Sequence, residues 1–506
     1  MRRSWPRNMW REAYRLWLGA GALALCLTAF PAAAEELQPI TTVLHVHSRM
    51  STGTLDLDGL AAEARRFGIG ALIMSENLVL RYEYGLFPLR GVIRAVKSWP
   101  SVTDFGVERY LAELRAASRR HPDVMFVPGV EVVPHYYWTG SLRTKDLTMH
   151  DGQKNLLLIG PDDPAVYRGI PAAGNVGAYT LQRQSVVELV LVMGIGGAGV
   201  WVLTAPRTRR ARLTHGVLGY RSRRWGRGLA LLLIAVLVAI NAFPFLQPPF
   251  DIYDAGLGVG PHQAVIDYGN AHGGLTIWSM PEAPDLHRVD YGRLGTVTIK
   301  TEPYPQLLDQ TEGYTAFGAV YAQPVTVTEA GGRWDGLLRA YNEGKRAAPV
   351  WGVAEAAFHG TARGKRLAEA ETVVWARARS QAAVLEALRL GRAYARRRGE
   401  DYALVLETFS VSAPGSDKTA ISGGLLRAPG PFLVRLRITA SDGVPRSVPV
   451  RIIRDGTVIW DEPVQLPADL AVPDEPPADP RRTYYRVMAG GAAYRLASNP
   501  IFVQAS

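Results

Sequence analysis

Residues 42–77 carry the sequence TVLHVHSRMSTGTLDLDGLAAEARRFGIGALIMSEN, and this stretch decides the fold. Its first six residues are β-branched or apolar apart from two histidines, which predicts a short strand over Thr42–His47. Asp58 is a candidate N-cap for a helix in which Leu60, Ala64 and Phe67 recur at helical spacing before Gly68 ends it. Residues 71–74 predict a second, buried strand. A strand, a helix and a strand in this order are typical of a parallel sheet.

The same alternation continues along most of the chain. Helices are expected over residues 110–119, 262–272 and 381–390, and further strands over residues 124–133, 275–279 and 349–353. This pattern predicts an α/β protein with a largely parallel sheet or barrel.

Two apolar runs without a charged residue interrupt this pattern, Leu189–Ala205 and Leu229–Leu246. Each is near the lower limit of length for crossing a bilayer. Eight arginines lie between them in residues 206–228, which favours a cytoplasmic loop over the alternative of two buried core helices. Residues 184–249 are therefore predicted to form a transmembrane helical hairpin. Small residues of the first run, Gly194, Gly196, Gly197 and Gly199, would let the second helix approach closely.

The N-terminus predicts export. Five arginines precede the apolar stretch Leu16–Phe30, and Ala32–Ala34 supply a cleavage site, so residues 1–34 are interpreted as a signal peptide. Alternatives are an uncleaved anchor and a lipoprotein signal at Cys26, which Leu25 disfavours. Residues 35–183 and 250–506 are then expected on the outer, periplasmic side of the membrane.

Charge and cysteine content exclude several function classes. The net charge is +11, but residues 1–34 contribute +4 and residues 206–228 contribute +8, which leaves −1 for the rest. We therefore expect no nucleic-acid partner. Cys26 is the only cysteine, which excludes internal disulfides, cysteine zinc sites and a thiol nucleophile in the mature chain.

Residues 402–506 have a different pattern. Phe432, Val434, Leu436 and Ile438 alternate with polar residues, which predicts a half-buried strand. Asp455-Gly456 between two apolar runs predicts a hairpin turn, and residues 467–480 are expected to form a proline-rich loop. A small antiparallel β-sandwich is the predicted fold.

The chemistry centres on His45 and His47. On a regular strand two residues this far apart project from the same face, so both imidazoles could reach one metal ion. Solvated or core-rim histidines would give the same pattern, and the pair alone is weak evidence.

The surrounding blocks resemble the PHP family, the polymerase and histidinol phosphatase metallo-hydrolases. The matching blocks are the quoted stretch with His45-Val46-His47 and Ser75-Glu76-Asn77, then Pro128-Gly129-Val130-Glu131, residues 273–282, residues 351–360 and residues 383–394. The resemblance covers residues 38–395 and implies a distorted seven-stranded β/α barrel, divided into residues 35–183 and 250–395, with metals at the carboxyl ends of its strands. It places His45, His47, Glu131 and His359 at ligand positions. Glu76 stands where the family has an aspartate. Glu355 is a candidate substitute, from a shifted position, for the aspartate that the family has near His359.

Departures from the family pattern reduce the expected number of metals. Thr52 and Met280 stand where the family has an aspartate and a histidine, Asn77 and Asn155 where it has histidines, and Ala357 where an aspartate is usual. These side chains are poor ligands for Zn²⁺ or Mn²⁺ beside imidazole and carboxylate. A cluster of two or three metals is therefore doubtful, and either a single divalent ion or a metal-free site is expected.

Two functions follow from this interpretation. The first is a weak or inactive relative of metal-dependent phosphoesterases, anchored in the membrane and used for binding or scaffolding of a protein partner. The alternative is an active single-metal phosphoesterase that hydrolyses a small phosphate ester outside the cytoplasm. Missing ligands favour the first, and the intact His45, His47 and Glu131 support the second.

The arginine-rich loop generates a topology prediction. Reporter fusions at Tyr220 should give a cytoplasmic signal, and fusions at Asp254 and Ser506 should give an outer-side signal. Alkaline phosphatase and green fluorescent protein fusions measure the two locations. An outer-side signal at Tyr220 would overturn the hairpin.

Overall fold

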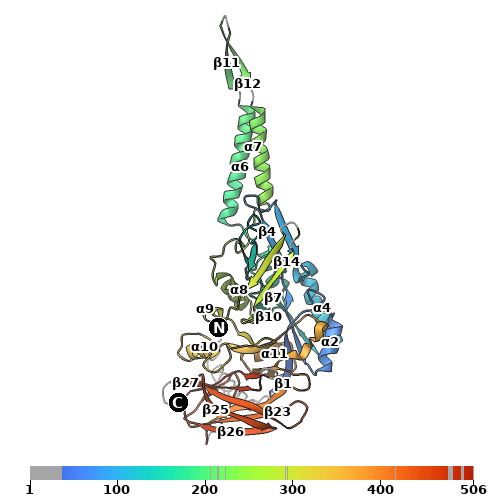
Figure 1. The fold of residues 1–506 in the computed structure, drawn as a ribbon, viewed down its shortest axis with the longest axis vertical. Coiled ribbons are helices and arrows are strands. Elements are labelled where there is room, and N and C mark those ends of the chain that lie inside the picture. Colours follow the sequence, from blue (N-terminus) through green and yellow to red (C-terminus); the bar gives the residue numbers. More distant parts are fainter. Residues whose placement is uncertain are drawn as a thin grey trace, which may run out of the picture.

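The computed structural model describes residues 37–205, 207–213, 216–222, 224–290, 292, 295–415, 417–476, 482–491 and 495–504. The predicted signal peptide and Cys26 lie outside these residues. The elements form an elongated molecule, with a pair of long helices projecting from one end and a β-rich domain at the other (Figure 1).

A closed circuit of strand pairings forms the centre of the molecule. Its members are β1 (Gln38–Val46), β2 (Ala71–Met74), β3 (Glu76–Asn77), β6 (Met125–Val127), β7 (Gly129–Val132), β10 (Leu156–Ile159), β13 (Leu275–Trp278), β16 (Ala316–Val320) and β17 (Trp351–Phe358). β1 pairs with β2, and β2 and β3 continue to β6 and β7. β7 pairs with β10, which leads through β13 and β16 to β17 and back to β1. All these pairs are parallel except those of β10, which runs antiparallel to both neighbours.

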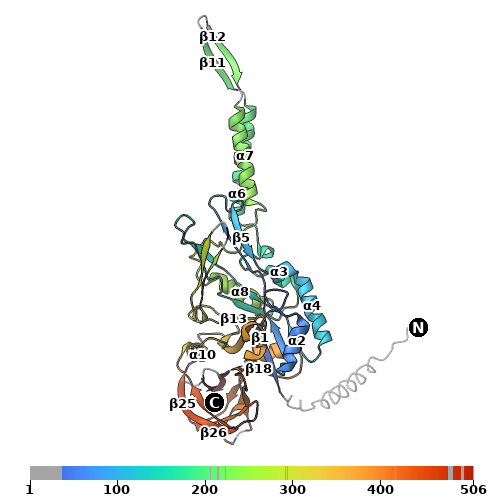
Figure 2. The same cartoon turned by 45° about the vertical axis from the view of Figure 1, so that its right-hand side comes forward.

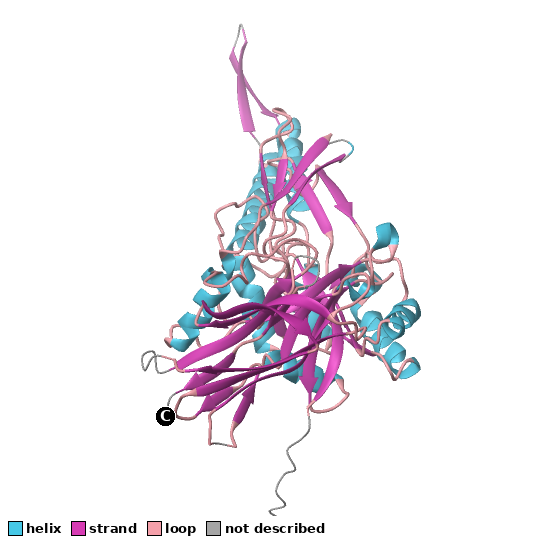
Figure 3. Cartoon of the chain, turned by 60° about the horizontal axis from the view of Figure 1, so that its bottom comes forward, coloured by secondary structure: helices cyan, strands magenta, loops and turns pink. Residues whose placement is uncertain are grey.

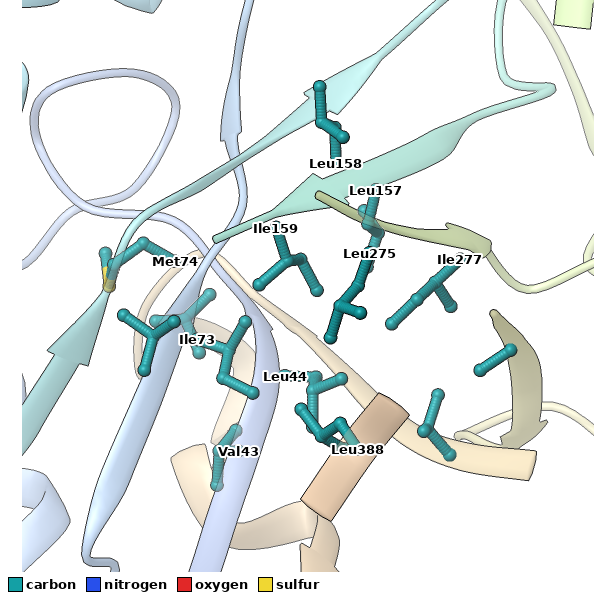
Figure 4. Packing of buried hydrophobic residues seen from close by; sticks show 14 of the residues in the cluster. Val43, Leu44, Ile73, Met74, Leu157, Leu158, Ile159, Leu275, Ile277 and Leu388 are labelled. Carbon is teal, nitrogen blue, oxygen red and sulfur yellow. The ribbon is translucent and has the colours of Figure 1, made fainter. Parts of the chain in front are cut away.

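Apolar side chains fill the space inside and around this circuit. In Figure 4, Leu44 of β1, Ile73 of β2, Ile159 of β10 and Leu275 of β13 lie near one another and near Leu388 of α11 (Gln381–Arg389). Leu44, Ile73 and Leu157 are fully buried. Each such side chain contributes about 1.5–3 kcal/mol relative to an exposed position. The predicted alternation of strand and helix thus has its physical cause in this shared core.

The outer helices follow the predicted periodicity with shifted ends. The predicted ones are α2 (Leu57–Arg66), α4 (Val107–Arg120), α8 (Gly260–Ala271) and α11; a further helix, α10 (Arg333–Asn342), was not predicted. The predicted cap of α2 was wrong: Asp56 occupies the N-cap, and its carboxylate accepts a hydrogen bond from Gly59 N at 2.8 Å. Asp58 instead lies in the first turn, where it pairs with Arg120 at 2.9 Å.

The central sheet continues into the C-terminal part of the chain. β18 (Ala370–Ala376) runs antiparallel to the first half of β1, and β19 (Ala393–Arg397) pairs with β18 and with β28 (Leu496–Ser498). A buried ion pair strengthens this junction, because Arg486 Nη2 lies 2.6 Å from Asp335 Oδ2 of α10 and both side chains are fully buried. Removing one partner of such a pair costs about 3–5 kcal/mol.

The C-terminal part contains two packed sheets (Figure 3). One has the order β21-β20-β23-β26, made of β20 (Leu404–Ser412), β21 (Thr419–Ile421), β23 (Phe432–Ala440) and β26 (Ala468–Asp474). The other contains β22 (Leu425–Arg427), β24 (Arg446–Arg454), β25 (Thr457–Leu466), β27 (Arg482–Ala489), β28 and β29 (Ile501–Gln504). A second apolar cluster, which includes Val434, Leu436 and Ile452, joins strands of both sheets.

Local predictions in this region were partly correct. Asp455 and Gly456 have φ of 50° and 85°, the left-handed backbone of the predicted hairpin turn. The predicted proline-rich loop was wrong in its first half, because residues 468–474 form β26. Pro473 lies there in an edge strand, the kind of strand in which proline is tolerated because only one side of the backbone pairs with a neighbour.

Two long apolar helices form the predicted interruption of the domain. Among the described residues, α6 (Arg183–Thr204) and α7 (Trp225–Ala242) are the two helices long and apolar enough to cross a membrane. They lie side by side, and a side chain added at Gly199 would meet Leu232 at 3.0 Å. Gly199 thus allows the predicted close approach, whereas Gly194 and Gly197 face no neighbour. Beyond them the backbone forms a hairpin of β11 (Arg207–Leu213) and β12 (Gly216–Ser222), and α7 ends four residues before the predicted Leu246.

Between the helical pair and the central sheet lies an aromatic subdomain that sequence reasoning did not predict (Figure 2). It contains β4 (Arg81–Gly85), β5 (Arg94–Ser98), β8 (Tyr137–Thr139), β9 (Thr148–His150), β14 (Asp285–Asp290) and β15 (Thr296–Thr301). Short helices α3 (Val102–Phe105), α5 (Pro164–Gly169) and α9 (Leu307–Gln310) complete the described fold. The subdomain strands come from the loops after β3, β7 and β13, so they cover the carboxyl ends of those strands.

The pairing circuit predicts that neither half of the domain folds alone, because β1 needs β17 and β10 needs β13. Thr180 and Gln247 exchange backbone hydrogen bonds of 3.1 and 2.9 Å, so the ends of the helical pair are adjacent. Replacing residues 184–245 by a few glycines and serines should therefore give a soluble protein with one cooperative thermal transition, measured by circular dichroism. Residues 35–183 alone should show no transition, and a cooperative one would contradict the single-domain interpretation.

Candidate metal centre

The end of β1 holds both predicted histidines, but not on a regular strand. His45 has a φ of 66°, and the register of β1 shifts between Leu44 and Val46 against both neighbouring strands. The expectation of simple strand alternation was therefore wrong at this point. The bulge turns the two rings toward the same place, with centroids 5.2 Å apart.

Glu131 of β7 completes a buried group of three. Its Oε1 lies 3.3 Å from His45 Nε2, and its Oε2 lies 3.7 Å from His47 Nε2. One ligand atom from each residue lies within 4.8 Å of the other two. The exposed fractions of His45, His47 and Glu131 are 1%, 0% and 7%. Two imidazoles and one carboxylate are the ligand set of many single-zinc sites.

Each histidine of the site is oriented through its other ring nitrogen. Nδ1 of His45 contacts Glu355 Oε2 at 2.9 Å, Nδ1 of His47 contacts Ser51 Oγ at 3.4 Å, and Nδ1 of His359 contacts Thr52 Oγ1 at 2.9 Å. A carboxylate or hydroxyl on one nitrogen fixes the ring and leaves Nε2 for a ligand, as in metal sites generally.

One atom of the group has no hydrogen-bond partner among the described residues. His47 Nε2 is buried and unpaired, although it faces Glu131. A buried polar nitrogen without a partner is costly, typically about 1–3 kcal/mol, and requires an explanation. A metal ion held between His45, His47 and Glu131 would satisfy it, so the residues present fit the ion that the PHP resemblance implies.

Electrostatics distinguish the two histidines. Burial lowers the pKa of His45, but the carboxylates of Glu131 and Glu355 outweigh burial and raise this pKa to about 10. Burial raises the pKa of Glu131, but the charge of His45 outweighs it and lowers this pKa to about 2. For His47, burial lowers the pKa well below its usual value. Without metal, His45 and Glu131 therefore form a charged pair and His47 keeps a free lone pair.

Three side chains at positions that depart from the PHP pattern form hydrogen bonds within the site. Asn77 Nδ2 donates to Glu131 Oε2 at 2.7 Å, and Asn155 Nδ2 donates to Glu131 Oε1. Thr52 donates to Asn77 Oδ1 at 2.9 Å. Both oxygens of Glu131 thus accept hydrogen bonds from amides, at two positions where the PHP resemblance would place histidine ligands.

The other predicted site residues surround the three central ones. Glu355 lies in β17 as the partner of His45. Glu76 accepts hydrogen bonds from Ser48 N at 2.8 Å and from Ser51, and burial raises its pKa to about 7 against these bonds. His359 is an exposed residue whose ring stacks on that of His47, with centroids 4.1 Å apart.

Two further residues were missed by sequence reasoning. Ser279 Oγ donates to Glu355 Oε2 at 2.7 Å and lies 3.2 Å from His45 Nδ1. Gly318 of β16 faces the same carboxylate, and a side chain there would meet Glu355 Oε1 at 2.3 Å. A glycine inside a buried strand signals a close approach, and that signal was available in the sequence.

No protein-family model matches the chain, and no curated protein matches it. Solved structures similar to it include a two-domain protein from Bacteroides vulgatus that contains a predicted PHP-like metal-dependent phosphoesterase. It is 10% identical, covers 92% of this chain and 95% of its own, and has a TM-score of 0.34. An amidohydrolase from Chromobacterium violaceum with bound sulfate and no metal is 14% identical, with 64% and 89% covered and a TM-score of 0.27. With TM-scores this low, the family resemblance rests on the sequence motifs.

The charged pair generates a pH prediction for the metal-free protein. Because its folded pKa is about 10 against an ordinary value of 6.5, the proton on His45 stabilises the fold below pH 6.5, and this contribution is lost as pH rises toward 10. Nitrogen-15 spectra of the histidine rings should show His45 doubly protonated at pH 8. Glu131→Gln should lower the pKa of His45, and Glu76→Gln, a buried carboxylate that does not contact His45, should not. Equal pKa values for His45 and His47 would contradict this assignment.

Proposed function

We propose that this chain is a membrane-tethered protein whose PHP-like domain binds one divalent metal ion, Zn²⁺ or Mn²⁺, through His45, His47 and Glu131. The observation that carries the proposal is the buried, unpaired Nε2 of His47, which faces the Glu131 carboxylate beside His45 Nε2. The Nδ1 contacts of both rings support it, because they leave the Nε2 atoms for a ligand.

The closed circuit of strands supports the family assignment within this proposal. Counting β2 with β3 and β6 with β7 as continued strands, we infer the distorted seven-stranded barrel that the motifs imply. His45, His47 and Glu131 then lie at or near the carboxyl ends of β1 and β7, the end at which barrels of parallel strands carry their sites.

One ion, rather than two or three, is the stoichiometry that the hydrogen bonds favour. Asn77 and Asn155 each direct an NH₂ group at Glu131, and an amide hydrogen in that place repels a second cation. Met280 uses its backbone N–H to contact Glu355 Oε1 at 3.3 Å and offers only a thioether. Thioether and amide groups are poor partners for Zn²⁺ or Mn²⁺ in a carboxylate site.

A single ion limits the chemistry. When bound, it would polarise a phosphoryl oxygen and lower the pKa of a water molecule. Paired metals stabilise both the attacking and the leaving oxygen of a phosphate ester, and one metal stabilises only one of them. We therefore propose that phosphoesterase activity is weak or absent and that the domain serves to bind a ligand or a protein partner.

The second candidate is an active single-metal phosphoesterase. The contact between Glu355 and His45 favours it, because a carboxylate behind a metal-binding histidine raises the basicity of the ligand in working metal sites. The exposed residue His359, next to the buried group, marks the side from which a substrate would enter.

We also propose that α6 and α7 cross the membrane, with the arginine-rich loop in the cytoplasm and the two large domains outside. Their length and apolar composition support this placement. Glu188, the one acidic residue of α6, lies 2.9 Å from Gln247 Nε2 near the start of the pair, where a charge stays close to the polar boundary of a bilayer.

Metal analysis of the purified protein tests the proposal. Inductively coupled plasma mass spectrometry should find about one Zn²⁺ or Mn²⁺ per chain, in keeping with one set of three ligands. Glu131→Ala should reduce the metal content strongly, because it removes the only carboxylate among those ligands. Glu76→Gln is the matched control: it changes a buried carboxylate of the same neighbourhood that does not face the Nε2 atoms, and it should retain the metal.

Activity separates the two candidates. Hydrolysis of p-nitrophenyl phosphate by the metal-loaded protein should be slow and little changed by His45→Ala. Two or more tightly bound ions per chain, with rapid hydrolysis lost on His45→Ala, would overturn the single-ion proposal. Retention of full metal content in Glu131→Ala would remove Glu131 from the ligand set.

A further inference from the structure

Apolar side chains gather at the base of the helical pair. Outside α6 and α7, the most exposed large apolar residues include Phe87 at 81%, Phe243 at 75% and Leu181 at 74%. Three neighbours of Phe87 in the turn between β4 and β5 are also exposed: Leu86, Val92 and Ile93. We call these six residues the apolar collar. Exposed apolar residues in the C-terminal domain, such as Val444 and Val458, stand singly, so the clustering needs an explanation.

The β4–β5 hairpin that carries most of the collar is held firmly. Tyr253 Oη accepts a hydrogen bond of 2.6 Å from Gly85 N, and the guanidinium of Arg90 lies 3.6 Å from the centre of the Tyr253 ring. Trp138 Nε1 donates to the carbonyl of Glu83 at 2.8 Å. Within the turn, Leu86 N donates to Ile93 O at 2.9 Å. The apolar tip is therefore presented by an ordered structure.

The tip touches the end of α7. Gly91 N donates to Asn241 Oδ1 at 2.9 Å, and a side chain at Gly91 would meet the Asn241 carbonyl oxygen at 2.1 Å. Asn241 lies in the last turn of α7, and Phe243 follows that helix directly. In the segment that leads into the other helix, Leu181 lies between Thr180, which pairs with Gln247, and the start of α6. The segments that carry the collar, which are the β4–β5 hairpin and the ends of α6 and α7, therefore lie together where the two helices enter the folded domain (Figures 1 and 2).

Charge at this level complements a lipid surface. Residues 81–98 contain four basic residues and one acidic residue. Apolar side chains flanked by basic ones are the composition of segments that insert into the interface of a bilayer with anionic lipids. Tyr84 of β4 shares an apolar cluster with Trp99 and Trp138 of the aromatic subdomain, and tyrosine and tryptophan are enriched at membrane boundaries.

We infer that the apolar collar inserts into the outer leaflet of the membrane that α6 and α7 cross, with the β4–β5 tip as a third point of contact beside the two helices. This inference rests on the proposed membrane crossing and adds a lipid-binding surface to it. Because the tip is fixed to α7 through Gly91 and Asn241, a bilayer that reaches the end of α7 also reaches Phe87. The contact would hold the domain at one height and tilt, with the aromatic subdomain between the lipid and the metal centre.

Depth-dependent fluorescence quenching of the full chain in liposomes tests the inference. In a Cys26→Ser background, which has no cysteine, single cysteines are placed at Phe87, Ile234 and Val444 and labelled with bimane. Ile234 is an exposed residue in the middle of α7, and Val444 is an exposed apolar residue of the distant C-terminal domain. The liposomes contain phosphatidylcholine and phosphatidylglycerol with a nitroxide either at the headgroup or deep in the acyl chain.

The expected result is a loss of bimane fluorescence at position 87 with the headgroup nitroxide, at position 234 with the deep nitroxide, and at position 444 with neither. Quenching at 234 without quenching at 87 would overturn the collar while leaving the transmembrane pair intact. Absence of lipid quenching at both positions would overturn the membrane crossing itself. Shielding of position 87 from aqueous iodide without quenching by either lipid would show that a protein covers the collar, and would also overturn the inference.

Discussion

A carboxylate buried among apolar strands is the constraint on which the rest of this structure depends. Glu131 is buried, yet its pKa is lowered to about 2, so the side chain carries a negative charge. The free-energy cost of burying this charge without a partner would be prohibitive. His45, Asn77 and Asn155 each direct a nitrogen at it. These residues come from the ends or edges of three different strand segments, so the closed circuit of pairings must form for the charge to be compensated.

The same constraint explains several local irregularities. The positive φ of His45 and the bulge in β1 bring its ring between Glu131 and Glu355. Gly318 leaves room for the second carboxylate, and Ser279 binds it. Strained backbone conformations are common at functional sites, where the surrounding structure holds the strained residues in place. The Nε2 of His47 is the atom of this arrangement that has no hydrogen-bond partner among the described residues, and an ion at the proposed site would satisfy it.

The two ends of the molecule attach to this centre in different ways. At one end the sheet continues through β18 and β19 into the C-terminal sheets, and the buried pair of Asp335 and Arg486 fixes that junction. At the other end the loops after β3, β7 and β13 form the aromatic subdomain, which lies at the base of the helical pair. The candidate metal centre lies at the end of the central strands that this subdomain covers, and the C-terminal sheets lie at the opposite end of the molecule from the helical pair.

The sequence by itself determined many of the elements and the residue types of the candidate site. Periodicity located α2, α4, α8, α11, several apolar strands and the two long apolar segments, because burial imposes spacing of 3.6 or 2 residues, or a continuous apolar run, on any chain. The motifs also identified His45, His47 and Glu131, whose side-chain types fit a metal ion. Asp58 and the proline-rich segment were misinterpreted because a cap is chosen by local geometry among neighbouring aspartates, and an edge strand accepts proline.

Only the tertiary structure decided which groups meet. It placed Glu355 behind His45, directed Asn77 and Asn155 at the oxygens of Glu131, and joined Gly91 to Asn241 across 150 residues of sequence. The tertiary structure also decided that β10 runs antiparallel to its neighbours, that β1 has a bulge at His45, and that the collar segments meet at the base of the helical pair. The physical reason is that pairing, register and distance between remote segments depend on how the whole core packs, and no local spacing records them.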